Sequence, residues 1–347
     1  MPFRDVTTNA GYITMAYDMG LVSGTTADTF SPDRTATREQ VAVILMRLYD
    51  KLHGEGPAQI AVASEPGDFT GLEAVAVPAG RLIVVGGKPT INATLRQEEA
   101  DAILEAARQA GAGKLLHLTG GPTAFNSTAA KTAAVVAEAV ASGGYDGVFL
   151  DVPGLSSKKS GAMTGLVKAL DAALGDKLLY VAAEAPTREG KAYGGYEYEA
   201  LAAAADRLVL RIAPHETLSN GFPTAPVDPL EEICYALGSL RGSVDGSKLT
   251  LMITTAPSAW SGSKKYSLTA EEYETLLADG KTEFHYSNRY ACAYLTGTLG
   301  SSREVVVWYL DRQAAAARLQ LARAFGVEQL CLSDWGTATG DLLAGLQ

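Results

Sequence analysis

Short apolar segments alternate with alanine-rich amphipathic segments along most of this 347-residue chain. The apolar segments predict buried strands, and the amphipathic segments, with helical spacing, predict helices. The strands are predicted at 59–63, 73–77, 114–118, 145–151, 177–182, 207–212, 248–253 and 328–333, and the helices at 96–110, 128–141, 162–174, 197–204, 228–240 and 312–325. Eight strands alternating with helices predict an α/β fold, a closed (β/α)8 TIM barrel over residues 58–347.

An open, doubly wound sheet is the alternative to a closed barrel. That fold binds nucleotides through a glycine-rich loop after its first strand, and no such loop follows residues 59–63. Three irregularities are expected in the barrel. Residues 64–72 leave little room for a first helix, residues 81–85 extend the second strand as a hairpin, and residues 266–294 form an insertion that walls one side of a groove.

Charge and cysteine spacing restrict the partners. Acidic residues outnumber basic ones, 39 to 29, and the basic ones are not clustered, which argues against nucleic acid and anionic membranes. Cys234, Cys292 and Cys331 lie far apart without metal-ligand spacing, so we interpret them as structural and expect no metal or other cofactor. No segment is apolar enough to span a membrane, and the first residues lack a signal peptide, so the chain is cytosolic or an upstream part is absent.

Four short motifs organise residues 1–53, around two amphipathic segments. They are Phe3 with Asp5 and Val6, then residues 21–24, 30–33 and 37–39. In this order they resemble an S-layer homology (SLH) module, which predicts a small helical domain at residues 1–53. A polar break at residues 54–57 is the predicted domain boundary.

The SLH resemblance implies attachment to secondary cell-wall polymer, and therefore an extracellular, cell-wall or S-layer location. It also implies that Arg38 contacts an anionic sugar, since a guanidinium matches a carboxylate with paired hydrogen bonds. The alternative is that Arg38 pairs with a neighbouring acid. Such modules usually occur in threes, so a lone one needs partners: further modules, other copies through self-association, or the neighbouring domain.

Residues 144–155, GYDGVFLDVPGL, hold the candidate site. If they form a strand, Val148, Leu150 and Val152 face one side, while Phe149 and Asp151 face the other. Asp151 then lies at the carboxyl end of a buried strand. (β/α)8 enzymes hold their catalytic groups at that end of the barrel.

This stretch resembles the catalytic strand of family 18 glycoside hydrolases, Asp-Gly-x-Asp/Asn-x-Asp-x-Glu. Asp146, Gly147 and Asp151 match the pattern, Phe149 replaces a polar residue, and Pro153 stands at the position of the general acid. Residues 196–216 and 305–336 are also similar to the family, especially to its spore-cortex and cell-wall branch. The resemblance implies the family fold and an amino-sugar or cell-wall glycan as ligand. Because proline has no proton to give, it argues against the family's hydrolysis.

In the family, the middle Asp orients the substrate's acetamido group and a Tyr after the sixth strand helps to hold it. Asp151 fits the first position, but the second falls near Ala213. The favoured hypothesis is therefore a non-catalytic barrel that binds glycan. Its candidate contacts are Asp151, Trp335, Trp260, His215 and Asp334, with Trp260 expected in an exposed loop.

Two other functions remain open. An active glycosidase of altered mechanism would use Asp151 with Glu184 or Glu216, although these acids also fit a polar rim of a non-catalytic barrel. A structural role in S-layer or surface-array assembly would use the barrel as a spacer. Asp146 is expected to be a turn or cap residue. His117 either faces the barrel mouth or is a hydrogen-bonded core histidine, and the second is favoured.

Overall fold

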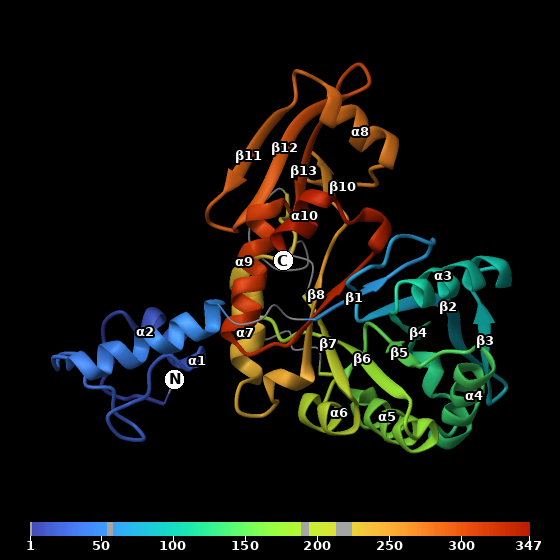
Figure 1. Ribbon diagram of the computed structural model, residues 1–347, viewed down its shortest axis with the longest axis horizontal. Coiled ribbons are helices and arrows are strands. Elements are labelled where there is room, and N and C mark those ends of the chain that lie inside the picture. Colours follow the sequence, from blue (N-terminus) through green and yellow to red (C-terminus); the bar gives the residue numbers. More distant parts are fainter. Residues whose placement is uncertain (1, 54–57, 189–193, 213–223) are drawn as a thin grey trace.

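Eight parallel strands close into a barrel in the computed structural model, which describes residues 2–53, 58–188, 194–212 and 224–347 (Figure 1). They are β1 (Ala58–Val62), β2 (Ala74–Val85), β4 (Gly113–Thr119), β5 (Gly147–Asp151), β6 (Leu178–Glu184), β7 (Arg207–Arg211), β8 (Leu249–Ile253) and β14 (Gln329–Leu332). The barrel is closed because β1 pairs in parallel with both β14 and β2. All eight predicted strands are confirmed, and the open sheet is excluded.

Helices follow most of the strands and cover the outside of the barrel (Figure 1). They are α3 (Gln97–Gln109), α4 (Ala129–Ser142), α5 (Ser160–Leu174), α6 (Tyr198–Ala204), α7 (Leu230–Leu240), α9 (Arg312–Ala324) and α10 (Gly340–Gly345). Capping side chains set several of the starts: Thr128 accepts from the N–H of Lys131 in α4, and Asp311 from that of Ala314 in α9. The six predicted helices are confirmed. None of the described helices is long and apolar enough to cross a membrane.

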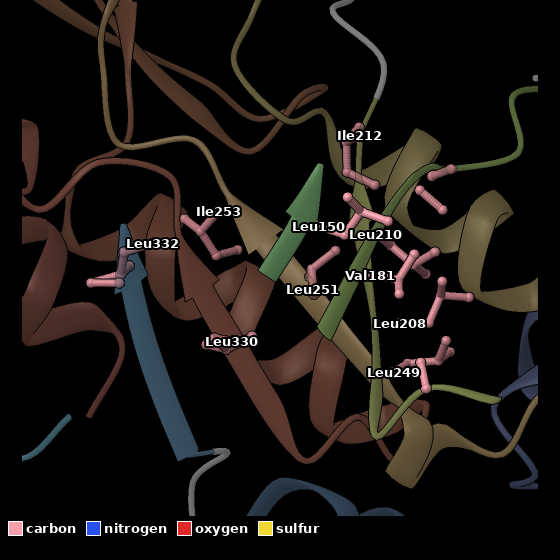
Figure 2. Close-up of a cluster of buried hydrophobic side chains, with 14 of the residues drawn as sticks. Leu150, Val181, Leu208, Leu210, Ile212, Leu249, Leu251, Ile253, Leu330 and Leu332 are labelled. Carbon is pink, nitrogen blue, oxygen red and sulfur yellow. The ribbon is translucent and has the colours of Figure 1, made fainter. Parts of the chain in front are cut away.

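Strand alternation divides the core into two clusters. Val148, Leu150 and Val152 of the β5 region pack outward in the large cluster that lies between strands and helices, which Figure 2 shows around Leu150 and Leu210. Phe149 packs inside the barrel with side chains from the other strands. The predicted facing of β5 is confirmed, so Asp151, two residues after Phe149, points to the barrel opening.

An antiparallel sheet is inserted between β8 and β14. Its strands are β9 (Ser258–Ser261), β10 (Lys264–Tyr266), β11 (Glu283–Ser287), β12 (Cys292–Leu299) and β13 (Arg303–Tyr309), with helix α8 (Ala270–Ala278) packed against β12. The insertion is therefore larger than the predicted 266–294. A second prediction, the hairpin at 81–85, is confirmed because β2 pairs antiparallel with β3 (Lys88–Ala93).

Trp260 lies in β9, and its side chain is buried, not exposed. The residue is 6% exposed, and its indole Nε1 donates to Ser258 Oγ at 3.1 Å. β9 pairs with β13 and β10, so the Ser- and Gly-rich sequence forms a hairpin within the inserted sheet. The expectation of an exposed loop at Trp260 was wrong.

Arg318 joins the insertion to the barrel. Its side chain, on α9, is fully buried (0% exposed). The guanidinium donates to the carbonyls of Val227, Asp228, Ala291 and Ala314. Burial lowers the pKa of Arg318, while the charge of Asp228 acts in the opposite direction. One side chain therefore connects α9, the segment before α7 and the turn before β12.

The amino-terminal motifs interlock as one unit. Asp5 accepts hydrogen bonds from the backbone N–H of Phe30 (2.8 Å) and Ser31 (2.7 Å), which lower its pKa. Phe3 is buried between Tyr17 (5.1 Å between ring centroids) and Phe30 (5.4 Å). The unit also contains helices α1 (Ala10–Asp18) and α2 (Arg38–His53). The small helical domain is thus observed, while the predicted boundary at 54–57 lies outside the described residues.

Gly24→Ala is expected to destabilise this module. A Cβ at Gly24 would lie 2.4 Å from Phe3 Cε1 and 2.4 Å from the carbonyl oxygen of Thr26, so the motif must shift. Overpacking of this kind costs about 1–3 kcal/mol. Limited proteolysis should show faster cleavage within residues 2–53. Gly11→Ala is the matched control, because a Cβ there meets no atom within 4 Å; equal cleavage of the two variants would contradict the prediction.

The module docks on the barrel at the end where the strands begin. Lys51 Nζ donates to the carbonyl of Ala324 at the end of α9 (2.7 Å), and the Arg241 guanidinium, just after α7, lies 5.2 Å from the Tyr17 ring centroid. Between them lies a cavity of about 160 Å³ that also reaches Leu249, the first residue of β8. Helices of such a barrel end beside the amino-terminal ends of the strands, so the module lies opposite the strands' carboxyl ends.

Candidate functional site

Asp151 and Arg211 form an ion pair across the barrel opening. Asp151 ends β5 and Arg211 ends β7, and β6 lies between these strands. Arg211 Nη2 donates to Asp151 Oδ1, and the two side chains are 25% and 15% exposed, respectively. The pair therefore occupies the floor of the opening, with one carboxylate oxygen already engaged.

His117, on β4, faces the other carboxylate oxygen. Its Nε2 lies 3.6 Å from Asp151 Oδ2, and its ring stacks on Phe149 with 4.9 Å between centroids. The residue is buried, as predicted for a core histidine. However, neither ring nitrogen has a hydrogen-bond partner in the part of the chain that the structure describes. His117 therefore faces the opening, which was the alternative to a hydrogen-bonded core histidine, and Asp151 is the acceptor that its Nε2 faces.

The surroundings keep both members of the pair charged. Burial raises the pKa of Asp151, but His117 and Arg211 outweigh it, and the pKa lies below its ordinary value. Burial lowers the pKa of Arg211, but Asp151, and to a lesser extent Glu184, raise it above its ordinary value. Asp151 is therefore a carboxylate at neutral pH.

Glu184, at the end of β6, reaches the backbone next to Pro153. Both of its carboxylate oxygens lie within hydrogen-bond distance of the N–H of Gly154, at 3.2 and 3.3 Å. Gly154 has a positive φ of 70°, which a residue without Cβ adopts freely. Tyr196 Oη donates to the carbonyl of Val152 (2.8 Å), and burial together with the charge of Glu184 raises the pKa of Tyr196. The Glu184 carboxylate thus lies next to Pro153, the residue that stands at the position of the general acid in the family 18 pattern.

Trp335 and Asp334 lie just beyond the carboxyl end of β14. Trp335 is half-buried, with its ring 5.8 Å from that of Phe69 at an interplanar angle of 64°. Asp334 Oδ1 accepts the N–H of Gly336 (3.1 Å), which caps the short turn Trp335–Thr337. His215, Glu216 and Ala213 lie outside the described residues. Of the predicted glycan contacts, the structure therefore places Asp151, Asp334 and Trp335 at this end of the barrel.

Comparisons with known proteins agree with both parts of the chain. Residues 2–42 match the family model of the S-layer homology domain. The amino-terminal module is an SLH domain. No curated protein matches the chain.

Solved structures resemble the barrel. A class V chitinase from Pseudomonas fluorescens is 18% identical, with a TM-score of 0.71, covering 84% of this chain and 98% of that one. The spore cortex-lytic enzyme SleL from Bacillus megaterium is 14% identical (TM-score 0.68; 84% and 74% covered). A family 18 N-acetylglucosaminidase from Paenibacillus barengoltzii is 14% identical (TM-score 0.66; 84% and 98% covered). At such identities the likeness shows the fold alone, the closed (β/α)8 barrel that these proteins share.

In the SLH domain, Arg38 is the first residue of α2 and is exposed. Among the described residues, no carboxylate lies within 4 Å of its guanidinium, so the alternative of a pair with a neighbouring acid is not seen there. Its contact with an anionic sugar remains a prediction. Asp146, expected to be a turn or cap residue, instead connects two strands: its Oδ2 accepts the N–H of Lys114 (2.9 Å) where β4 and β5 begin.

Sequence reasoning missed Arg211, the partner that determines what Asp151 can do. A signal was present: in the predicted strand 207–212, Arg207, Val209 and Arg211 share one face. Val209 packs inside the barrel, so Arg211 faces inward at the opening. An arginine on the inner face at a strand's carboxyl end requires an acid nearby.

Proposed function

We propose that this is a cell-surface protein, held to cell-wall polymer by its SLH domain, whose barrel binds an amino-sugar glycan without cleaving it. The observation that carries the proposal is the state of Asp151. Its carboxylate is engaged by Arg211 and faced by His117, while Pro153 replaces a proton donor. The fold and the SLH domain support a location at the wall, where such glycans occur.

Glycoside hydrolysis needs a proton for the leaving oxygen and a second group that attacks or orients. Pro153 cannot supply the proton, and the low pKa of Asp151 keeps that residue ionised at neutral pH. Asp151 is also held by Arg211 from across the opening. These features support binding rather than cleavage.

Trp335 offers the apolar surface on which a sugar ring can stack, and the opening offers carboxylates as hydrogen-bond acceptors. The structures that resemble the barrel belong to proteins named as chitinases, a cortex-lytic enzyme and an N-acetylglucosaminidase. We therefore expect the ligand to be a β-linked amino-sugar polymer, from chitin or from peptidoglycan.

Trp335→Ala is expected to weaken binding of chito-oligosaccharides and muropeptides about two- to tenfold, since an aromatic stacking contact is worth roughly 0.5–1.5 kcal/mol. Calorimetry of the purified chain measures this, and chromatography of the same samples should show no products. Phe284→Ala, at an exposed aromatic of the insertion, is the matched control and should bind as the wild type does. Products would instead indicate a hydrolase in which Asp151 works with Glu184 or Glu216.

A role in surface assembly has one observation in its favour. The SLH domain exposes large apolar side chains on α1 and α2: Tyr12, Met15, Val41, Val43, Leu45, Met46 and Tyr49. Apolar surface of this kind is typical of a contact with another protein or module. If neither glycan binds the barrel and sedimentation shows oligomers, the assembly role replaces the proposal.

A further inference from the structure

Three charged side chains at the opening are Asp151, Glu184 and Arg211. Two of them are negative and one is positive. Arg211 contacts Asp151 directly. Among the described residues, no Lys, Arg or His nitrogen lies within 4 Å of the Glu184 carboxylate, whose observed donor is the neutral N–H of Gly154. Glu184 is half-buried.

His117 provides a second, independent sign of a polar ligand. The residue is 8% exposed, and both ring nitrogens lack a hydrogen-bond partner in the described part of the chain. Its Nε2 points toward Asp151 at 3.6 Å. Buried polar atoms of this kind are normally satisfied by protein, water or ligand. Nδ1 of His117 therefore has unused hydrogen-bonding capacity at the floor of the opening, while Nε2 is directed to Asp151.

We propose that the opening prefers amino sugars whose amine is free, with Glu184 receiving the ammonium group. This inference rests on the proposed function, in which the barrel binds an amino-sugar glycan. It adds that the amine of the preferred glycan is not acetylated and carries a positive charge. An ammonium donates up to three charge-assisted hydrogen bonds to carboxylates, whereas an acetamido group has no charge and one N–H donor. Glu184 reaches the backbone beside Pro153, so it places the charge where a sugar at the opening would lie.

The test compares glucosamine tetramer with N-acetylglucosamine tetramer by calorimetry at a pH where the glucosamine amine is charged. Wild-type protein is expected to bind the glucosamine tetramer at least tenfold more tightly. Glu184→Gln keeps the shape and an acceptor for Gly154 but removes the charge, and should bring the two affinities within about twofold of each other. Glu199→Gln, at an exposed position of α6, is the matched control and should retain the preference.

A pH series on the wild type gives a second measurement that needs no variant. The preference should disappear as the pH rises through the pKa of the ligand amine, because the ammonium is then lost. Equal or tighter binding of the N-acetylated tetramer by the wild type, or an unchanged preference in Glu184→Gln, would overturn this inference and leave the proposed function standing. Failure of both tetramers to bind would overturn this inference, and failure of muropeptides to bind as well would overturn the proposed function.

Discussion

Arg318→Ala is expected to lower the free energy of unfolding by about 3–5 kcal/mol. The guanidinium is fully buried and donates to four backbone carbonyls, so its loss leaves buried acceptors without donors and opens a cavity. Three of these carbonyls lie outside α9, in the segment before α7 and in the turn before β12. Urea unfolding followed by circular dichroism measures the change.

Arg318→Lys should fall between wild type and alanine, because an ammonium keeps the charge but offers fewer donors in a different geometry. Arg108→Ala is the surface control. Its ion pair with Glu105 is exposed, and such pairs contribute about 0–1 kcal/mol. A loss below 1 kcal/mol in Arg318→Ala would show that Arg318 does not join the insertion to the barrel.

Arg211→Met is expected to cost about 3–5 kcal/mol at pH 7, because it leaves the Asp151 carboxylate buried without its cation. The double variant Asp151→Asn with Arg211→Met should recover most of that loss, since no charge is then left unpaired. Urea unfolding of Asp151→Asn, Arg211→Met and the double variant gives the coupling free energy between the two residues. Additive losses would indicate that the two residues act independently.

The pH dependence follows from the lowered pKa of Asp151. A carboxyl whose pKa is lower in the folded state contributes stability above its unfolded pKa, about 3.9, and loses it as the pH falls through the folded value. The wild type should therefore lose stability on acidification below about pH 4. Asp151→Asn should lack the pH-dependent stability that comes from this carboxylate. The difference in free energy of unfolding between wild type and Asp151→Asn should therefore become smaller at low pH.

The barrel could be predicted from sequence because its strands are buried on both faces and read as short apolar segments. The apolar segments at 207–212 and 248–253, for example, can be recognised as strands from their local sequence alone. The insertion was underestimated because β9 and β13 pair with each other across nearly the whole inserted segment. A Ser- and Gly-rich sequence around Trp260 gives no local sign of that pairing.

The candidate site was only partly predictable. The position of Asp151 follows from strand alternation, which is local. Its partner Arg211 is 60 residues away, and the contact exists only because β5 and β7 flank β6 in a closed barrel. Likewise, the reach of Glu184 to Gly154 depends on how β6 ends beside β5, which no spacing in the sequence reveals.

The position of the SLH domain on the barrel determines in which direction the barrel opening faces when the protein is anchored. The domain docks beside the ends of α7 and α9, where the strands begin, whereas Asp151, Glu184 and Trp335 lie at or beyond the strands' carboxyl ends. On an anchored chain of the proposed function, the opening therefore points away from the polymer that the SLH domain holds. A single molecule would bridge two separate glycan strands, the anchoring strand below the barrel and a second strand above it.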